Sequence, residues 1–413
     1  MNRLIILTNS PGEVAGWVKP VLDALSPRKL PIEILLAVLP CPYASGAEAD
    51  YGATLPGVCA AVKYKELSNK SLNDGKNLIL QLGGDPMFGR LLSRRLKCDW
   101  MIYSARPKFK KYVKKFFLPD EYAEQRFRKA KVNNRAYKRV GNLILDSMPL
   151  FRDKQQAMNV MNITEYEPMV SFLPGSRPFE YYMGGAFFVR AAQELMNRYE
   201  NLSAYLVLAP TVDEKILIKG FEENGVEWRG DDRAEEIPCN NGKSIKIIRD
   251  KGFAAIKASE LAVAFPGTNN LQIAAMGTPL LMVAPLNCAE EIPLDGVAGL
   301  IPFKLPGFRT LKKKLVLFAN KRNKYVSLPN RIAGEEIVPE HRRIMTPLTV
   351  AHLADELITN PEKLYGIKEG YEKIEFEYGA SRRIADEIER FFTSRRKRSL
   401  SLYIMAEIEE TVD

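Results

Sequence analysis

The twelve residues Met169–Glu180, which read MVSFLPGSRPFE, constrain the fold more than any other segment of the chain. An apolar run of strand length breaks at Pro174-Gly175, and a pattern of helical period follows. A strand that passes through a glycine turn into a helix leaves backbone N–H groups pointing at the space above the turn, where the helix dipole favours an anion. Gly175, Ser176 and Arg177 are therefore candidates for binding phosphate. The alternative is an ordinary turn with a surface arginine.

Strand-like and helix-like segments alternate along both halves of the chain. The first half opens with another such unit: a strand at Arg3–Asn9, a glycine-containing loop at 10–16, and a helix from Trp17. Continuous apolar strands that alternate with helices are typical of a parallel sheet covered on both faces. Further strands are expected at 32–39, 78–82, 100–104, 115–118, 137–142, 205–210, 244–250, 260–267 and 279–285, and a short one at 325–328 that ends at Pro329-Asn330.

The fold class that this pattern predicts is α/β, with two Rossmann-like, doubly wound domains that face a cleft. We expect an N-terminal domain at 1–165, a C-terminal domain at 166–360, and C-terminal helices with a basic tail at 361–413 that pack back on the N-terminal domain. Ligands of open α/β sheets bind at the carboxyl ends of the strands, so both opening loops would face the cleft.

The composition excludes several classes of protein. Five cysteines form no CxxC pair and only two histidines are present, so neither a disulfide framework nor a structural zinc site is expected, and no metal or cofactor is predicted. No apolar run is long enough to span a bilayer. The first residues resemble a strand rather than a secretory signal. We therefore expect a cytoplasmic protein.

A net charge of +10 indicates an anionic partner or well-solvated basic helix faces. Basic residues cluster at Arg90–Arg95, Lys108–Lys115, Lys312–Lys324 and Arg395–Arg398. No zinc finger or RNP-like segment is present, so no nucleic-acid partner is expected. The apolar loop Ile301–Phe308, next to the third cluster, favours peripheral contact with anionic lipid on the inner face of the cytoplasmic membrane.

A second segment, FPGTNNLQIAAMGTP at 265–279, also offers an anion site. It places Gly267, Thr268, Asn269 and Asn270 where a helix begins, so their backbone N–H groups and side chains can hold phosphate oxygens. The alternative is that Thr268 or an asparagine caps the helix.

Four stretches occur in the order found in a known family: GEVAG (12–16), VGNLILDSM (140–148), FLPGSRPFE (172–180) and SLPNRIAGEEIVPE (327–340). On these stretches the chain resembles lipid A disaccharide synthase, an inverting glycosyltransferase of the GT-B architecture. That enzyme joins a UDP-linked diacylglucosamine to a lipid-linked glucosamine phosphate. The segment 266–279 resembles the donor site of the family more loosely.

The resemblance implies roles for particular residues. A UDP-sugar donor would lie with its diphosphate over Gly175–Arg177 and Gly267–Asn270, and Gln272 and Asn330 stand in the other donor-side motifs. Gly12 and Gly16 would lie on the acceptor-side loop. The acceptor would be a lipid-linked sugar or a phosphosugar, and a homodimer is left open.

The chain also departs from the pattern of the family. Ala15-Gly16-Trp17 replaces Ser-Gly-Asp, and Gln272 stands where a glutamate is usual. GGDPMF (83–88) replaces Asp-Ala-Pro-Asp-Phe and puts Met87 at the catalytic position of the family. The segment 286–310 differs throughout. We therefore interpret the chain as a divergent member whose acceptor is not identified.

An inverting glycosyltransferase needs a base that removes the proton of the acceptor hydroxyl. Asp85 follows a strand end and a Gly-Gly pair, and Glu13 lies in the first loop; both are candidates. Each could instead have a structural role: Asp85 could cap the following helix, and the charge of Glu13 could interact with a helix dipole. Two alternative functions remain: a UDP-sugar epimerase of the same architecture, and a catalytically degenerate sugar-nucleotide-binding protein.

Overall fold

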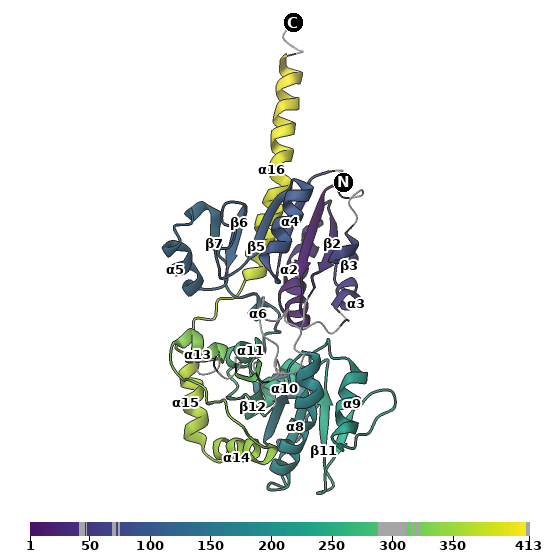
Figure 1. The fold of residues 1–413 in the computed structure, drawn as a ribbon, viewed down its shortest axis with the longest axis vertical. Coiled ribbons are helices and arrows are strands. Elements are labelled where there is room, and N and C mark those ends of the chain that lie inside the picture. Colours follow the sequence, from purple (N-terminus) through teal and green to yellow (C-terminus); the bar gives the residue numbers. More distant parts are fainter. Residues whose placement is uncertain are drawn as a thin grey trace. The chain divides into compact units, whose positions relative to one another are not determined.

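A computed structural model describes residues 1–40, 46, 48–67, 72, 75–287, 310, 312–314, 318 and 323–409. These residues form two compact units (Figure 1). The N-terminal unit comprises Met1–Pro40, Glu48–Ser147 and Glu377–Asp413, and the C-terminal unit is chiefly Met148–Phe376. The loop Ile301–Phe308, which we predicted to contact lipid, lies outside the described residues.

The N-terminal unit is built on a seven-stranded, fully parallel sheet of order β3-β2-β1-β4-β5-β6-β7. Successive residues of the central strand β1 are buried on opposite faces, with Leu4 and Ile6 in one core and Ile5 and Leu7 in the other. Both faces are therefore covered, as continuous apolar strands predict. The strands are β1 (Arg3–Thr8), β2 (Glu33–Val38), β3 (Val58–Lys63), β4 (Asn77–Gln81), β5 (Asp99–Tyr103), β6 (Lys115–Leu118) and β7 (Tyr137–Arg139).

Helices form a layer on each face of this sheet. α2 and α16 contribute to the core that contains Leu4, and α4 and α5 contribute to the core that contains Ile5. The helices are α1 (Pro11–Glu13), a π-helical turn (Val14–Val18), α2 (Lys19–Leu25), α3 (Glu48–Ala53), α4 (Pro86–Leu96), α5 (Glu121–Lys129), α6 (Leu143–Asp146) and α16 (Ala380–Glu409). Short 3-10 turns lie at Ser26–Arg28, Tyr64–Glu66 and Asn134–Ala136.

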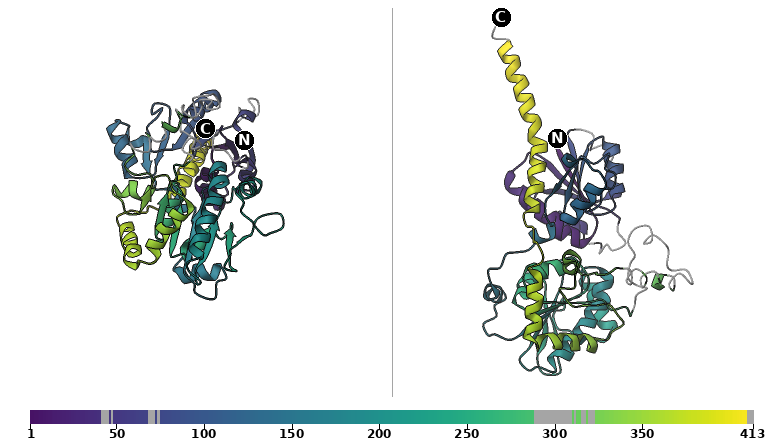
Figure 2. Two further views of the ribbon diagram at one scale, coloured as in Figure 1. Left: turned by 60° about the horizontal axis from the view of Figure 1, so that its bottom comes forward. Right: turned by 90° about the vertical axis from the view of Figure 1, so that its left-hand side faces the viewer.

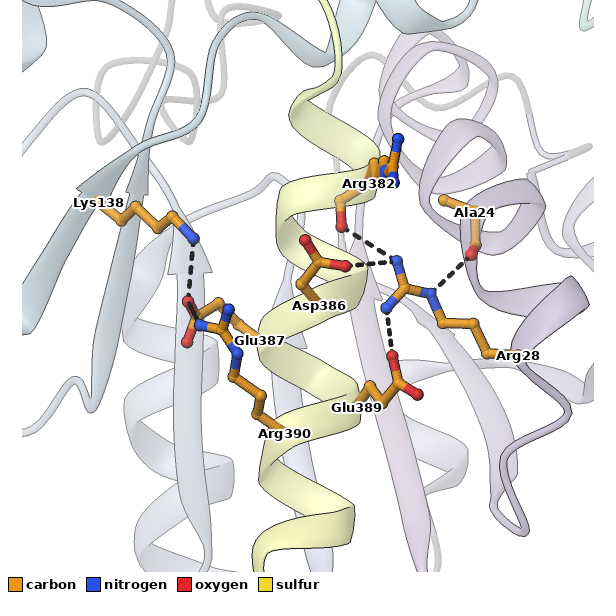
Figure 3. A network of polar contacts seen from close by, with 8 residues as sticks. All are labelled: Ala24, Arg28, Lys138, Arg382, Asp386, Glu387, Glu389 and Arg390. Carbon is orange, nitrogen blue, oxygen red and sulfur yellow. Dashed lines mark hydrogen bonds and ion pairs between the residues drawn. The ribbon is translucent and has the colours of Figure 1, made fainter.

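The C-terminal helix α16, yellow in Figures 1 and 2, belongs to the N-terminal unit. Its first half packs Ile384, Ala385, Ile388 and Phe392 into the core beside α2. Charged contacts add to this packing: Arg28 donates to Asp386 at 2.7 Å and to Glu389 at 2.6 Å (Figure 3). On another side of the helix, Lys138 and Arg390 both donate to Glu387, at 3.1 and 3.0 Å.

The C-terminal unit has a second seven-stranded sheet, of order β10-β11-β9-β8-β12-β13-β14. All its pairs are parallel except β10–β11. The central strand β8 lies between β9 and β12. The strands are β8 (Met169–Leu173), β9 (Ser203–Val207), β10 (Glu236–Pro238), β11 (Ser244–Ile248), β12 (Leu261–Ala264), β13 (Leu280–Val283) and β14 (Glu340–His341). Two mostly parallel sheets with helices confirm the predicted α/β class.

Helices cover this sheet as well, and α8 packs against α9 and α14, while α10 packs against α7. They are α7 (Lys154–Val160), α8 (Pro178–Met196), α9 (Glu214–Glu223), α10 (Gly252–Ala258), α11 (Asn269–Ala275), α13 (Leu328–Ala333), α14 (Pro347–Ile358) and α15 (Pro361–Tyr371). Across the described part of the chain, no helix is both long and apolar enough to cross a bilayer.

The strand predicted at 325–328 is wrong, because helix α13 begins at Leu328. Pro329 fits the first turn of a helix, where its missing N–H costs nothing. The N–H groups of Val326 and Ser327 donate to the Glu340 carboxylate, at 2.8 and 3.0 Å, and not to a neighbouring strand. The place beside β13 is taken by β14.

Candidate functional site

The two predicted phosphate loops lie side by side in the C-terminal unit. Each follows a central strand, β8 or β12, and Leu173 and Ala264, the last residues of these strands, are paired in register. The Phe265 N–H donates to the Leu173 carbonyl oxygen at 3.3 Å. Because β8 separates β9 from β12, this is the point where the strand order reverses, which is where open α/β sheets bind ligands.

The backbone of the first loop is already bonded to a carboxylate of the protein. One oxygen of Glu180, Oε2, accepts from the N–H groups of Ser176 and Arg177, at 3.1 Å each. Gly175 has a φ of +93°, and a methyl group there would lie 2.2 Å from the same oxygen. The two N–H groups that the sequence suggested were unpaired are thus satisfied in the structure. The glutamate three residues after the N-cap is the sequence signal for this arrangement.

Arg177 remains the cation of this loop. Its Nη1 lies 3.4 Å from Oε1 of Glu180, and its side chain is 41% exposed. Burial raises the pKa of Glu180, and the positive charge of Arg177 and the backbone N–H groups oppose that shift. The guanidinium is therefore anchored on one side by a buried carboxylate and partly open to solvent, an arrangement suited to contact with an anion.

The second loop is held from within by Asn270, which is fully buried. Its Oδ1 accepts from the Gly267 N–H at 3.4 Å, and its Nδ2 donates to the carbonyl oxygen of Phe265 at 3.0 Å and to Oδ1 of Asn269 at 3.2 Å. Gly267 and Thr268 are exposed, and the Thr268 hydroxyl makes no capping hydrogen bond. Gln272 is 9% exposed. Of the predicted residues here, Gly267 and Thr268 are the most accessible to a ligand.

Asn330 is also buried, and its amide is fully engaged with the protein. Its Oδ1 accepts from the N–H groups of Ile337 and Val338, at 2.8 and 2.9 Å. Its Nδ2 donates to the Val338 carbonyl oxygen at 3.0 Å and to the Glu340 carboxylate at 3.2 Å. The structure thus shows Asn330 joining α13 to the segment that leads into β14. These hydrogen bonds give a structural reason why the asparagine of the motif SLPNRIAGEEIVPE precedes the Val-Pro-Glu triplet by a set number of residues.

In the N-terminal unit the loops that carry Glu13 and Asp85 also lie together. They follow β1 and β4, which are paired in register at Leu7 and Gln81. The Glu13 carboxylate accepts from the Ser10 N–H at 3.3 Å. A methyl group at Gly83 would lie 2.1 Å from Oε2 of Glu13, so this carboxylate lies directly against the Gly83-Gly84 loop.

Asp85 is the N-cap of α4, which is the structural role that the sequence offered as the alternative to a catalytic base. Its Oδ1 accepts from the Met87 N–H at 2.8 Å, and Pro86 occupies the first turn. The residue is exposed, and within the described part of the chain its Oδ2 has no hydrogen-bond partner. The cap therefore uses one carboxylate oxygen and leaves the other available for a proton.

The two glycines predicted on the acceptor-side loop differ in their surroundings. A methyl group at Gly16 would lie 2.3 Å from Cδ1 of Ile144, so this glycine permits close packing of the π-helical turn against α6. Gly12 is half-buried in α1. Among the described residues, no group of three or more His, Cys, Asp and Glu side chains is arranged to hold a metal ion.

Residues 111–289 match the family model described as lipid-A-disaccharide synthetase. The chain is similar to the lipid-A-disaccharide synthase of Rickettsia prowazekii, at 27% identity over 227 residues, which cover 55% of this chain and 49% of that enzyme. It is 28% identical to the synthase of Erwinia tasmaniensis over 202 residues, which cover 49% of this chain and 43% of that enzyme. The chain spans about half the length of the curated relatives it matches. The resemblance to this family is confirmed.

Solved structures with the same fold include proteins with UDP or a UDP-sugar bound. The S. aureus MnaA–UDP co-structure superposes with a TM-score of 0.52 at 14% identity and covers 95% of this chain and 97% of its own. The UDP-GlcNAc 2-epimerase from Neisseria meningitidis bound to UDP-GlcNAc gives a TM-score of 0.52 at 13% identity, covering 94% and 100% of the two chains. At this identity the likeness shows the fold, two Rossmann-like α/β domains, and nothing of the chemistry.

Proposed function

We propose that this chain is an inverting glycosyltransferase that resembles lipid A disaccharide synthase. In this proposal it transfers a sugar from a UDP-sugar, a UDP-linked acylated glucosamine or a relative of it, to a lipid-linked or phosphorylated sugar. The observation that carries the proposal is that, in each sheet, two loops lie side by side at the point where the strand order reverses. A partly exposed arginine stands in the C-terminal unit, and two carboxylates stand in the N-terminal unit. The identity to the synthases supports it.

The proposed reaction assigns a role to each loop. The acceptor hydroxyl attacks the anomeric carbon from the face opposite the diphosphate, the bond from that carbon to the diphosphate oxygen breaks, and UDP leaves. Asp85, through its second oxygen, or Glu13 takes the hydroxyl proton. Arg177 and the exposed backbone at Gly267 and Thr268 stabilise the charge that develops on the leaving diphosphate.

The donor half of the proposal is tested by measuring the affinity for UDP by calorimetry. Replacing Arg177 by Ala should remove a charge-assisted contact worth about 1.5–3 kcal/mol, or roughly ten- to hundredfold in affinity. Arg190→Ala is the matched control, because Arg190 is exposed on the same helix and donates to the Asn224 carbonyl. Unchanged affinity in the Arg177 variant, or an equal loss in both variants, would contradict the assignment.

A UDP-sugar 2-epimerase is the second candidate, favoured by the UDP-GlcNAc 2-epimerase from Neisseria meningitidis, which has the same fold. An epimerase changes the donor without consuming an acceptor. The two functions are separated by incubating UDP-GlcNAc and a UDP-acylated glucosamine with the protein alone and following the sugar protons by NMR. A new C2 epimer would favour the epimerase. A chain that binds UDP and converts neither sugar, with or without acceptor, would be the degenerate binding protein.

We further propose an anionic membrane surface as a partner, because a lipid-linked sugar is one of the two proposed acceptors. A described surface fits this role: Met87 and Leu91 on α4 are 49% and 52% exposed, and Phe109 and Tyr112 in the following loop are 38% and 54% exposed. The Arg90 guanidinium lies over the Tyr112 ring, 3.6 Å from its centroid, and joins the two pairs. Exposed basic residues near these positions in the sequence are Arg94, Arg95, Lys108, Lys110 and Lys111.

This surface starts two residues after Asp85, so a lipid-linked sugar held there would have its lipid next to the apolar side chains. Sedimentation with phosphatidylglycerol vesicles should occur at low salt and decrease as salt rises, because each basic residue near the surface contributes on the order of 1 kcal/mol that salt screens. Replacing Met87 and Leu91 by Ser should weaken it. Leu150→Ser is the control, since Leu150 is 78% exposed in the C-terminal unit. Equal binding of all variants would contradict this surface.

A further inference from the structure

A buried glutamine lies beneath the loop that carries Asp85. Gln81, the last residue of β4, is fully buried. Its Nε2 donates to the carbonyl oxygen of Gly83 at 2.9 Å and to that of Asp85 at 3.0 Å. Both N–H bonds of the amide are therefore used on one loop. Gly83 and Gly84 have φ values of +119° and +69°, which other residues rarely adopt, so the loop depends on these contacts for its shape.

The oxygen of the Gln81 amide carries a cost in stability. Its Oε1 is buried, and within the described part of the chain it has no hydrogen-bond partner; the same holds for the neighbouring Nε1 of Trp100. A methyl group at Gly89, on α4 above, would lie 2.2 Å from that oxygen and 2.6 Å from Nε1 of Trp100. An unpaired buried acceptor costs about 1–3 kcal/mol, which an apolar side chain of similar length would avoid. The Nε2 group, which donates both hydrogen bonds, is therefore the part of the amide that acts on the loop.

We propose that Gln81 is a positioning residue that sets the direction of the Asp85 carboxylate. The inference rests on the proposed function. Gln81 fixes the carbonyl groups before and at Asp85, and the Met87 N–H holds Oδ1, so Oδ2 is presented in one direction. Without these donors the Gly83-Gly84 backbone gains conformations, and Asp85 points at the acceptor hydroxyl for only part of the time.

The test is Gln81→Met, which keeps the length of the side chain and removes both donors. The turnover number should fall roughly 10- to 100-fold, because an error of about 1 Å in a catalytic group costs up to that much. The KM for the donor and the affinity for UDP should not change, since the donor loops lie in the C-terminal unit. Gly89→Ala should give the same pattern by another route, because its methyl group would displace the Gln81 amide.

Asn77→Leu is the matched control. Asn77 is a buried amide at the other end of β4, its Nδ2 donates to the Leu72 carbonyl oxygen at 2.5 Å, and its Oδ1 also has no partner in the described part of the chain. This variant should change the melting temperature without lowering turnover.

Gln81→Glu adds a second measurement, the pH dependence of the activity, which a loss of packing alone would not change. A carboxylate cannot donate to the two carbonyl oxygens, but a protonated carboxyl can donate once, so the activity of this variant relative to the wild type should rise as pH falls.

Three results would overturn the role of Gln81. They are a Gln81→Met turnover within twofold of an active wild type, an equal loss of turnover in Asn77→Leu, and a pH-independent ratio for Gln81→Glu. A wild-type chain without transferase activity would refute the proposed function and this role together.

Discussion

The Asp146 carboxylate joins the two places where the chain crosses between units, and its removal should destabilise the N-terminal unit. Asp146 ends α6, just before the chain leaves the unit at Ser147. Its Oδ1 accepts from the Gly379 N–H at 2.7 Å, and its Oδ2 accepts from the Ser381 N–H and from Ser381 Oγ, also at 2.7 Å. These donors follow the return of the chain at Glu377 and start α16.

The size of the effect follows from these contacts. A hydrogen bond to a charged group contributes about 1.5–3 kcal/mol, and loss of a helix cap alone costs about 0.5–2 kcal/mol. The three bonds share one acceptor and are only partly buried, so they do not add fully. We expect Asp146→Ala to lower the free energy of unfolding of the N-terminal unit by about 2–4 kcal/mol.

Urea unfolding followed by tryptophan fluorescence measures this change, because Trp17 and Trp100 lie in the N-terminal unit, and Trp228 in the C-terminal unit reports on the control. Asp153→Ala is the matched control. Asp153 also caps a helix, α7 in the C-terminal unit, but from an exposed position: its Oδ1 accepts the Gln156 N–H at 2.8 Å, and its Oδ2 accepts only from the exposed side chain of its neighbour Arg152, at 3.3 Å. Asp146→Ala should therefore cost clearly more than Asp153→Ala. Equal or smaller destabilisation by Asp146→Ala would refute the idea that the Asp146 carboxylate stabilises both segments where the chain passes between the units.

Three further predictions concern the site loops. Burial raises the pKa of Glu180 above its ordinary value of 4.5, so the folded state holds this proton more tightly than the unfolded chain. The free energy of unfolding should therefore fall as pH rises from about 4.5 through the folded pKa. Urea titrations of Glu180→Gln at several pH values should show a flatter pH dependence of the free energy of unfolding. Asp85→Asn should cut turnover roughly 10²–10⁴-fold while melting temperature and UDP affinity stay unchanged, since Asn caps as well as Asp; full turnover would transfer the role of base to Glu13. Gly83→Ala should lower the calorimetric melting temperature, because its methyl group would meet the Glu13 carboxylate at a φ of +119°; an unchanged value would contradict the packing described here.

The sheets and the positions of the loops could be predicted from the sequence because their signals are local. Runs such as Arg3–Thr8 and Met169–Leu173 are buried along their whole length and mostly apolar, and the glycine turns after them mark the carboxyl ends of the strands. The order of loops along the chain then brings Gly175 near Gly267 and Glu13 near Gly83 once the strand order is known. The strand order itself is not encoded locally.

The atoms that occupy each site could not be predicted in the same way. Glu180, three residues after the N-cap, is a sequence signal for a capped turn, but which N–H groups its carboxylate binds, those of Ser176 and Arg177, depends on the fold of the loop. Asn330 lies in a motif that suggested ligand contact, and its amide is used entirely within the unit. Gln81 reads as a strand residue, and its loop contacts depend on two left-handed glycines. Such assignments depend on tertiary contacts, which override the local pattern.

The proposed function requires this chain to make a glycosidic bond with inversion at the anomeric carbon. It is tested most directly by incubating the purified protein with a UDP-linked diacylglucosamine and a lipid-linked glucosamine phosphate, and by determining the linkage of any product by NMR. The account predicts one UDP released for each disaccharide formed, with a β linkage from the α-linked donor, and strong loss of both products in Arg177→Ala and Asp85→Asn. An α-linked disaccharide, an epimerised UDP-sugar with the acceptor unconsumed, or no conversion of either substrate would contradict it.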